Sequence, residues 1–176
     1  MDKYVNMADI NSGNALSDDE TVALIELLFF AYRDFVSDPD ALLEQQNFGR
    51  AHHRVVHFVG RDPGMTVAQL LDILRITKQS LSRVLKDLID KGYVFQKEGE
   101  TDRRQRLLHL TEKGEELRQQ LMAPQMARIR RAVTEASSQG GDGMRAMLYH
   151  LISSENREDV ESWIARARGA GAKNGS

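Results

Sequence analysis

Hydrophobic residues between positions 66 and 92 recur at the spacing of two short amphipathic helices. The first stripe consists of Val67, Leu70, Leu71 and Leu74, and the second consists of Leu81, Val84, Leu85 and Leu88. Both follow the i, i+3, i+4, i+7 pattern that gathers side chains on one helical face. Thr66 and Thr77 stand before them as N-cap residues, and Gly92 suits a left-handed C-terminal cap. The sequence therefore predicts two consecutive short helices, each with an inward face.

A hairpin pattern follows the second helix. Tyr93, Val94 and Phe95 favour a strand, and residues 104–110 alternate as a returning strand would. The tip, residues 97–103, carries ordinary turn residues beside more arginine than a turn needs. A helix held against a second helix can enter a DNA major groove, while a cationic hairpin reaches the backbone or minor groove. This order of elements predicts a DNA-binding regulator.

Polar residues on the outward face of the second helix and in the hairpin are the candidates for DNA contacts. The candidates are Thr77, Lys78, Gln79, Ser80, Ser82, Arg83, Lys86, Arg103, Arg104 and Arg106. Their side chains can bond phosphates or base edges, and Arg83 is the strongest base-reading candidate because arginine bonds guanine in a bidentate way. Taken singly, Lys86 is equally well a solvated helix charge. The hairpin arginines can also pair with Glu98, Glu100 and Asp102.

The net charge of −2 is not typical of a DNA-binding protein, but the charges are unevenly distributed along the chain. Residues 77–106 hold eight Lys or Arg against five Asp or Glu, a local charge of +3. Residues 1–46 hold ten acids against two basic residues, a local charge of −8. The basic surface is therefore local, and we expect the acidic amino end to lie away from DNA.

Helical patterns flank this central segment. Asp18, Asp19 and Glu20 favour a helix start before a broad apolar face that extends to Phe35. Pro39 ends that helix, and another is expected over 48–59, before the turn 61–64. The carboxy-terminal pattern predicts a long helix over 111–136 that Pro124 kinks or divides. A break at 140–143 follows, then a helix over 144–152 and a short last helix capped by Asn156.

Several motifs in order resemble the winged helix-turn-helix domain of MarR-family bacterial transcriptional regulators. They are the run Thr77-Lys78-Gln79-Ser80-Leu81-Ser82-Arg83, then Asp102-Arg103-Arg104, then Leu110-Thr111-Glu112-Lys113-Gly114. The resemblance implies that Asp102 braces Arg104 in the wing, while Arg104 approaches the minor groove. It also implies a homodimer whose recognition helices address a pseudo-palindrome, with terminal helices of two subunits interlocked.

The expected fold class is mostly α with a small β-hairpin wing. Its parts are an amino-terminal arm and dimerisation helix (1–46), a winged helix-turn-helix domain (47–111), dimerisation helices (112–167) and a flexible tail (168–176). The chain has no cysteine, which excludes disulfides and thiolate metal sites, and no signal-peptide pattern. These features predict a soluble cytoplasmic protein.

Three histidines in the sequence RAHHRVVHF admit more than one interpretation. His53 and His57 stand at i, i+4, where two imidazoles can meet one metal, but no carboxylate or thiol nearby completes a ligand set. The favoured interpretation is that His52, His53 and His57 line a helix interface with satisfied hydrogen bonds. A third is that these histidines, with Phe30, border the effector pocket in which the resembled family binds small, often aromatic, molecules.

The leading hypothesis is a dimeric transcription factor, most simply a repressor, that is modulated by a small-molecule effector. A second hypothesis is a winged-helix module whose basic face binds an acidic partner protein, because winged helices serve both purposes. A histidine metalloenzyme lacks ligands and any recognisable nucleophile or general base. We therefore expect no catalytic residue, no metal and no cofactor.

Overall fold

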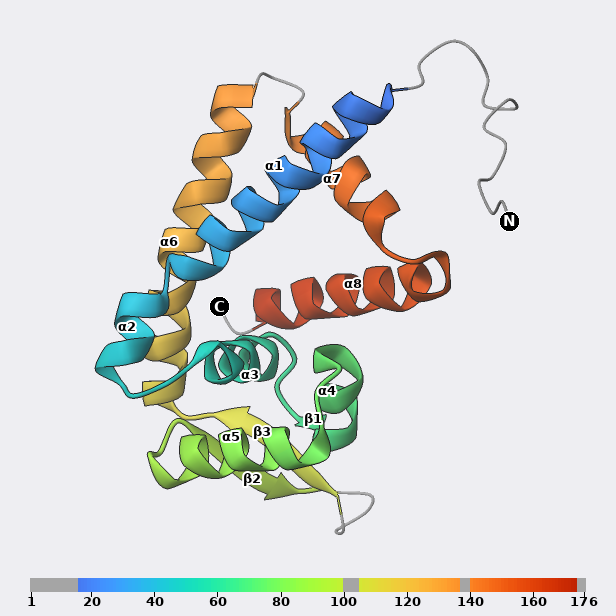
Figure 1. Cartoon of the computed structure of the whole chain (residues 1–176). Helices are drawn as coiled ribbons and strands as arrows, with labels where there is room; N and C mark the ends of the chain where they lie inside the picture. Colours follow the sequence, from blue (N-terminus) through green and yellow to red (C-terminus); the bar gives the residue numbers. More distant parts are fainter. Residues whose placement is uncertain (1–15, 100–104, 137–139, 174–176) are drawn as a thin grey trace, which may run out of the picture. The chain divides into compact units, whose positions relative to one another are not determined.

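The computed structural model describes residues 16–99, 105–136 and 140–173 (Figure 1). The chain divides after Ser37 into two compact units. The first contains helix α1 (Asp18–Ser37), which begins at the predicted acidic residues and has no buried residue. Ser17 starts it with a reciprocal pair of hydrogen bonds to Glu20, 2.8 Å and 3.3 Å long. The predicted first helix is thus confirmed, and Pro39 follows its end.

The second unit contains the predicted helices and hairpin in the predicted order. Helix α3 (Arg50–Arg61) precedes α4 (Val67–Leu74) and α5 (Lys78–Asp90). Strands β2 (Val94–Glu98) and β3 (Arg106–Leu110) form the antiparallel hairpin, with Val94 opposite Leu110 and Glu98 opposite Arg106. The fold class is therefore mostly α with a small sheet, as predicted.

Two short elements were not predicted. Helix α2 (Asp40–Gln45) follows Pro39, and strand β1 (Met65–Thr66) joins the sheet beside β3, giving the order β1-β3-β2. Met65 pairs with Leu108, a residue far along the chain. Each element is too short to produce a periodic pattern.

Caps set the ends of the two central helices at the predicted residues. The Thr66 hydroxyl accepts the Gln69 backbone N–H, and the Gln69 side chain accepts the Thr66 N–H at 2.8 Å, which completes the capping box. Thr77 accepts the Ser80 N–H at 3.2 Å. Gly92 takes the left-handed conformation, with φ +75°. These local bonds explain why the helix boundaries were readable from the sequence.

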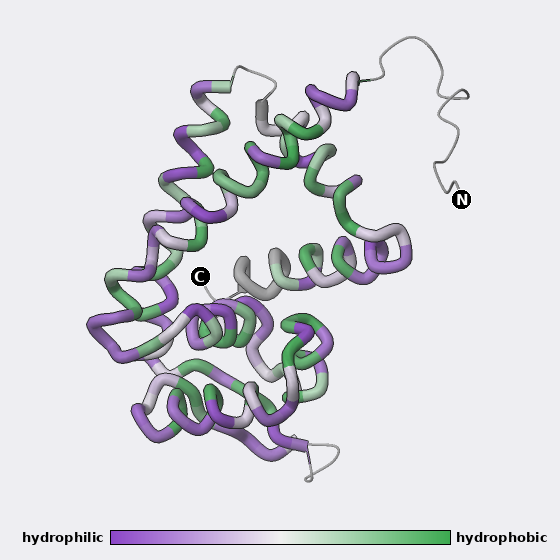
Figure 2. The backbone as a smooth tube through the Cα atoms, viewed as in Figure 1, coloured by the Kyte–Doolittle hydropathy of each residue, from purple (hydrophilic) through white to green (hydrophobic). Residues whose placement is uncertain are grey.

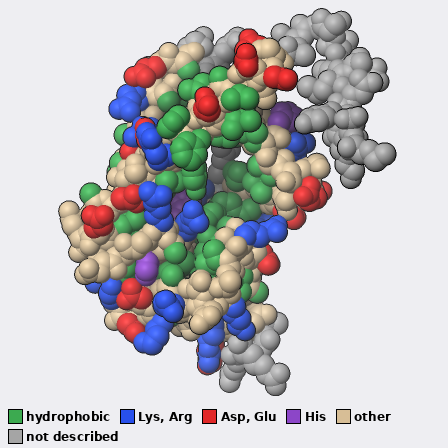
Figure 3. Space-filling model, in the orientation of Figure 1, with side chains coloured by type: hydrophobic (Ala, Val, Ile, Leu, Met, Phe, Trp, Pro, Cys, Tyr) green, Lys and Arg blue, Asp and Glu red, His purple; other side chains and the backbone are tan. Residues whose placement is uncertain are grey.

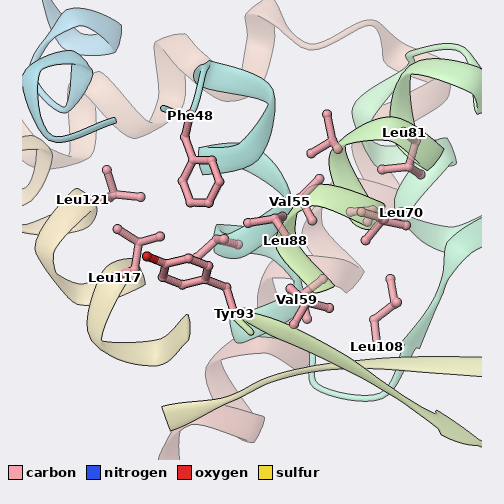
Figure 4. Packing of buried hydrophobic residues seen from close by; sticks show 14 of the residues in the cluster. Phe48, Val55, Val59, Leu70, Leu81, Leu88, Tyr93, Leu108, Leu117 and Leu121 are labelled. Carbon is pink, nitrogen blue, oxygen red and sulfur yellow. The ribbon is translucent and has the colours of Figure 1, made fainter. Parts of the chain in front are cut away.

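The core lies where α3, α5 and the sheet meet the start of α6 (Glu112–Ala136) (Figure 4). The predicted stripe of α5 is buried there, together with Val55 and Val59 of α3 and Leu108 of β3. Leu117 and Leu121 of α6 close the same cluster. Helix α5 and the hairpin are therefore packed directly on the main hydrophobic core.

The sequence Leu110-Thr111-Glu112-Lys113-Gly114 joins this sheet to α6. The Thr111 hydroxyl donates to the Gly92 carbonyl at 2.7 Å and accepts the Gly114 N–H at 3.0 Å. A Cβ at position 114 would lie 2.0 Å from the Tyr93 carbonyl oxygen. Only glycine allows the first turn of α6 to lie so close to the backbone just before β2.

Of the carboxy-terminal helices, α6 has its predicted bounds and the later ones do not. Helix α6 runs through Pro124 without dividing, and α7 (Gly140–Leu151) includes the glycines expected to form a break. These glycines occupy the first turn of α7, where the negative charge of Asp142 interacts favourably with the helix dipole. After the short 3-10 helix η2 (Ser154–Asn156), α8 (Arg157–Lys173) extends into the segment predicted as a flexible tail. An established helix propagates with one new hydrogen bond per residue, which favours this extension.

Among the described residues, no helix has the combination of length and hydrophobicity that crossing a bilayer requires.

Candidate nucleic-acid interface

Helix α5 has one face in the core and one face in solvent. Figure 2 shows hydrophilic and hydrophobic residues alternating along it. The positions of α5 predicted to contact DNA are all exposed, namely Lys78, Gln79, Ser80, Ser82, Arg83 and Lys86. Figure 3 shows Lys and Arg side chains over the part of the chain that carries α5 and the hairpin, with Asp and Glu side chains among them. The structure thus brings the helical candidates together on one accessible surface.

The residue that precedes α5, Thr77, both caps the helix and is exposed to solvent. Thr77 is exposed, and its hydroxyl lies 2.9 Å from the Ser80 hydroxyl as well as capping the Ser80 N–H. The amides of a helix amino end favour negatively charged groups, including phosphates. This end of α5 therefore presents a site at which a phosphate can be bound.

The cations differ in how far they are already paired. Lys86 forms an ion pair with Asp90 one turn later, and the hydrogen bond that it donates to Asp90 raises the pKa of Lys86. In the hairpin, Arg106 pairs with Glu98 at 2.8 Å. Within the described part of the chain, Lys78 and Arg83 form no ion pair. Of the predicted contacts, these two are the most available to DNA.

The remaining wing candidates lie outside the described residues. They are Asp102, Arg103 and Arg104. The strands that lead to them are described, and the Gly99 N–H bonds the Gln105 carbonyl at 3.1 Å, which closes the hairpin at that point. The bracing of Arg104 by Asp102 stays a prediction.

The three histidines of α3 occupy different environments. His52 bonds Asp87 of α5 at 3.1 Å, whereas His53 is 8% exposed. Burial, followed by the nearby Arg54 charge, lowers the pKa of His53. Burial also lowers the pKa of His57, to about 4, with smaller contributions from the charges of His53, Arg118 and Arg61. Among the described residues, no group of three or more His, Cys, Asp or Glu side chains is placed to hold a metal ion.

An aromatic cluster joins α3 to α8, and the sequence did not reveal it. Phe58 lies edge-on to both His57 and Trp163, with ring centroids 5.1 Å apart in each pair. His57 Nδ1 and Trp163 Nε1 are buried without a hydrogen-bond partner in the described structure. Phe30, the fourth predicted pocket residue, is exposed on α1 and packs edge-on against Phe29 at 5.3 Å.

A second link reaches the turn between α4 and α5. Arg75 occupies the left-handed conformation, with φ 51°, at the end of α4. Its guanidinium donates to the Asp72 carbonyl at 3.1 Å and to the Asn156 side chain at 3.1 Å. Asn156, predicted as a helix cap, therefore connects the carboxy-terminal helices to the helix-turn-helix. No local pattern could indicate a contact 81 residues apart.

The fold and the exposed face of α5 define a winged helix-turn-helix protein, and comparison with known proteins gives its class. A model of the MarR family matches residues 46–105. The HTH-type transcriptional regulator PetP of Rhodobacter capsulatus is 49% identical over 146 residues, which cover 83% of this chain and 88% of that protein. The chain belongs to the MarR family of transcriptional regulators. Membership in a family of regulators also confirms the prediction that the chain is not an enzyme.

Solved structures share the fold at low sequence identity. FabT of Streptococcus pneumoniae, solved in complex with DNA, has a TM-score of 0.66 and 22% identity, covering 80% of this chain and 99% of that one. A MarR family protein of Mycobacterium tuberculosis, solved in complex with p-aminosalicylic acid, has a TM-score of 0.54 and 22% identity, covering 74% and 98%. At these identities the likeness shows the fold alone.

Proposed function

We propose that this regulator binds a pseudo-palindromic DNA operator as a homodimer and represses transcription until a small molecule changes its affinity. Helix α5 enters the major groove and the hairpin contacts the neighbouring backbone or minor groove. The observation that carries the proposal is the exposed face of α5, where Lys78 and Arg83 are unpaired among the described residues and the opposite face is buried. Half-sites about one helical turn, roughly 34 Å, apart would be engaged together by two such helices.

The DNA-binding roles are tested with fluorescence anisotropy on operator fragments selected from the source genome. Arg83→Ala is expected to weaken operator binding about tenfold and to relax sequence preference, because a bidentate arginine–guanine contact discriminates between bases. Arg104→Ala is expected to weaken binding to all sequences and to reduce the slope of log K against log salt by about 1. Arg130→Ala, at an exposed position of α6, is the matched control. Wild-type affinity in both Arg83→Ala and Arg104→Ala would contradict the assignment.

Support for the homodimer comes from α1. Its apolar side chains occur on all sides of the helix, and Leu27 and Phe29 are each 63% exposed. A helix that is hydrophobic all round is stable in water only when other surfaces cover it. A second subunit supplies such a surface, as the interlocked terminal helices of the family imply.

Support for an effector site comes from the aromatic cluster of His57, Phe58 and Trp163. Two buried polar atoms in it lack hydrogen-bond partners in the described structure, which costs free energy that a ligand can recover. The complex of the mycobacterial relative with p-aminosalicylic acid makes a small aromatic acid the first compound to test. Trp163 is the one tryptophan of the chain, so its fluorescence reports on this site. A saturable change on titration, lost in His57→Leu, is expected; an unchanged spectrum up to millimolar aromatic acids would contradict an aromatic-acid effector.

A further inference from the structure

A polar bridge joins the DNA-facing helix to the helix beneath it. His52, in the first turn of α3, places its Nε2 3.1 Å from the Asp87 carboxylate of α5. The His52 side chain is 16% exposed and that of Asp87 is 35% exposed, so the contact is partly shielded from water. Asp87 also pairs with Lys91 at 3.2 Å, at the carboxyl end of the same helix. The bridge is therefore attached to the second half of α5.

Both nitrogens of the His52 ring have assigned roles. Nδ1 accepts the Gly49 backbone N–H at 3.1 Å, so the His52 side chain bonds the residue before the first turn of α3. Because an accepting nitrogen carries no proton, the ring's N–H is at Nε2, where it donates to Asp87. One side chain thus fixes the start of α3 and a point on α5 at the same time. Its ring nitrogens are occupied, which removes His52 from the residues free to bind an effector.

Aromatic packing holds the ring in this orientation. His52 stacks on Phe48, with centroids 4.6 Å apart and planes 16° apart. Phe48 in turn meets Tyr93 edge-on at 5.2 Å, and Figure 4 shows these two side chains beside each other in the core. Lys91 Nζ lies 4.4 Å from the centre of the Phe48 ring. The carboxyl end of α5 is therefore held by directional contacts as well as by apolar packing.

Directional contacts limit the rotation of α5 about its own axis, which apolar packing alone limits poorly. Leucine and valine side chains tolerate a small rotation of a helix about its own axis, whereas a hydrogen bond weakens steeply with misalignment. Rotation of α5 by about 10° would move groups ~6 Å from its axis by about 1 Å. A shift of that size is enough to spoil a bidentate contact to a base edge, while contacts to phosphates adapt more easily.

We propose that His52 is a positioning residue for sequence recognition, which sets the rotation of α5 through Asp87 so that Arg83 and Gln79 meet their bases. The inference rests on the proposed binding of DNA through α5. It assigns to His52 and Asp87 an effect on discrimination between sequences, with little effect on non-specific affinity. This is a different role from that of the residues that touch DNA.

The decisive variant is His52→Gln. Glutamine at this position can still accept the Gly49 N–H with its side-chain oxygen, but its single amide cannot also reach Asp87. We expect operator affinity to fall about tenfold while affinity for a scrambled duplex stays within about twofold, so that the ratio of the two falls. Asp87→Asn retains an oxygen acceptor for the His52 N–H and is expected to retain most of the discrimination. Asp72→Ala, which removes an exposed carboxylate of α4 that forms no ion pair among the described residues, is the control and is expected to keep the ratio.

A double-mutant cycle separates positioning from stability. Asp87→Ala alone and His52→Gln with Asp87→Ala are expected to lose the same discrimination, because each removes the same bridge. Thermal unfolding of every variant checks that the proteins are folded at the temperature of the binding measurement. Additive losses, or a wild-type ratio in His52→Gln, would overturn the inference even if Arg83→Ala lost affinity as expected. Absence of specific binding by the wild-type protein would instead overturn the proposed function.

Discussion

His57 illustrates how a single buried side chain can set the response of the protein to acid. Its pKa is lowered from 6.5 to about 4, first by burial and then by the charges of His53, Arg118 and Arg61. In the unfolded chain the ring takes up a proton near its ordinary pKa, whereas in the folded chain it stays neutral until the pH approaches 4. Between these values the unfolded state binds more protons, so acid favours unfolding.

The contribution of His57 to the free energy of unfolding is expected to be constant well above pH 6.5 and to decrease between pH 6.5 and 4, by about 3 kcal/mol. His53, whose pKa is also lowered by burial, adds a decrease of the same sign. Urea unfolding of wild type and His57→Gln at several pH values measures the effect. The variant should lose a substantial part of the acid dependence, while His150→Gln, at an exposed position of α7, should behave as wild type. Parallel curves for wild type and His57→Gln would refute the explanation.

At the scale of elements, the sequence predicted the parts whose signals are local. Apolar spacing and the caps at Thr66, Thr77 and Gly92 located α4 and α5 to within a residue or so, because each cap bonds a backbone group of its own helix. The phase of α5 also identified its exposed face. Strand β1 and helix α2 were missed, since they are short and their stability comes from contacts with residues distant in sequence.

The same distinction explains which parts of the site were predictable. The exposure of Arg83 follows from its position one residue before the buried Val84. The pairing of His52 with Asp87 could not be predicted from sequence position, because the two residues are 35 positions apart and neither residue type indicates a particular partner. The link from Arg75 to Asn156 and the burial of Trp163 Nε1 are likewise products of tertiary packing. Sequence patterns identified the exposed surface that we propose contacts DNA, whereas the contacts that hold α5 in place depend on residues distant in sequence.

At the scale of the whole molecule, α1 and the carboxy-terminal helices leave apolar surface that the described chain does not cover. Met147, Leu148 and Leu151 of α7 are 42–58% exposed, and α1 has no buried residue. Burial of apolar surface contributes roughly 25 cal/mol per Å², so covering several such side chains by a second subunit would strongly favour association. The proposed binding to two half-sites would depend on the same surface, because it needs the α5 helices of two subunits together.

This dependence leads to a prediction for Phe29→Glu. A charged group in place of a ring that is 63% exposed in one chain should be tolerated by the isolated helix but should oppose its burial against a partner. We expect light scattering after size-exclusion chromatography to show a mass near that of one chain, 19.9 kDa, and operator affinity to fall at least tenfold while half-site binding persists. Gln120→Glu adds the same charge at an exposed site on α6 and should remain a dimer. A dimer in both variants, with unchanged operator affinity, would exclude α1 from the subunit interface.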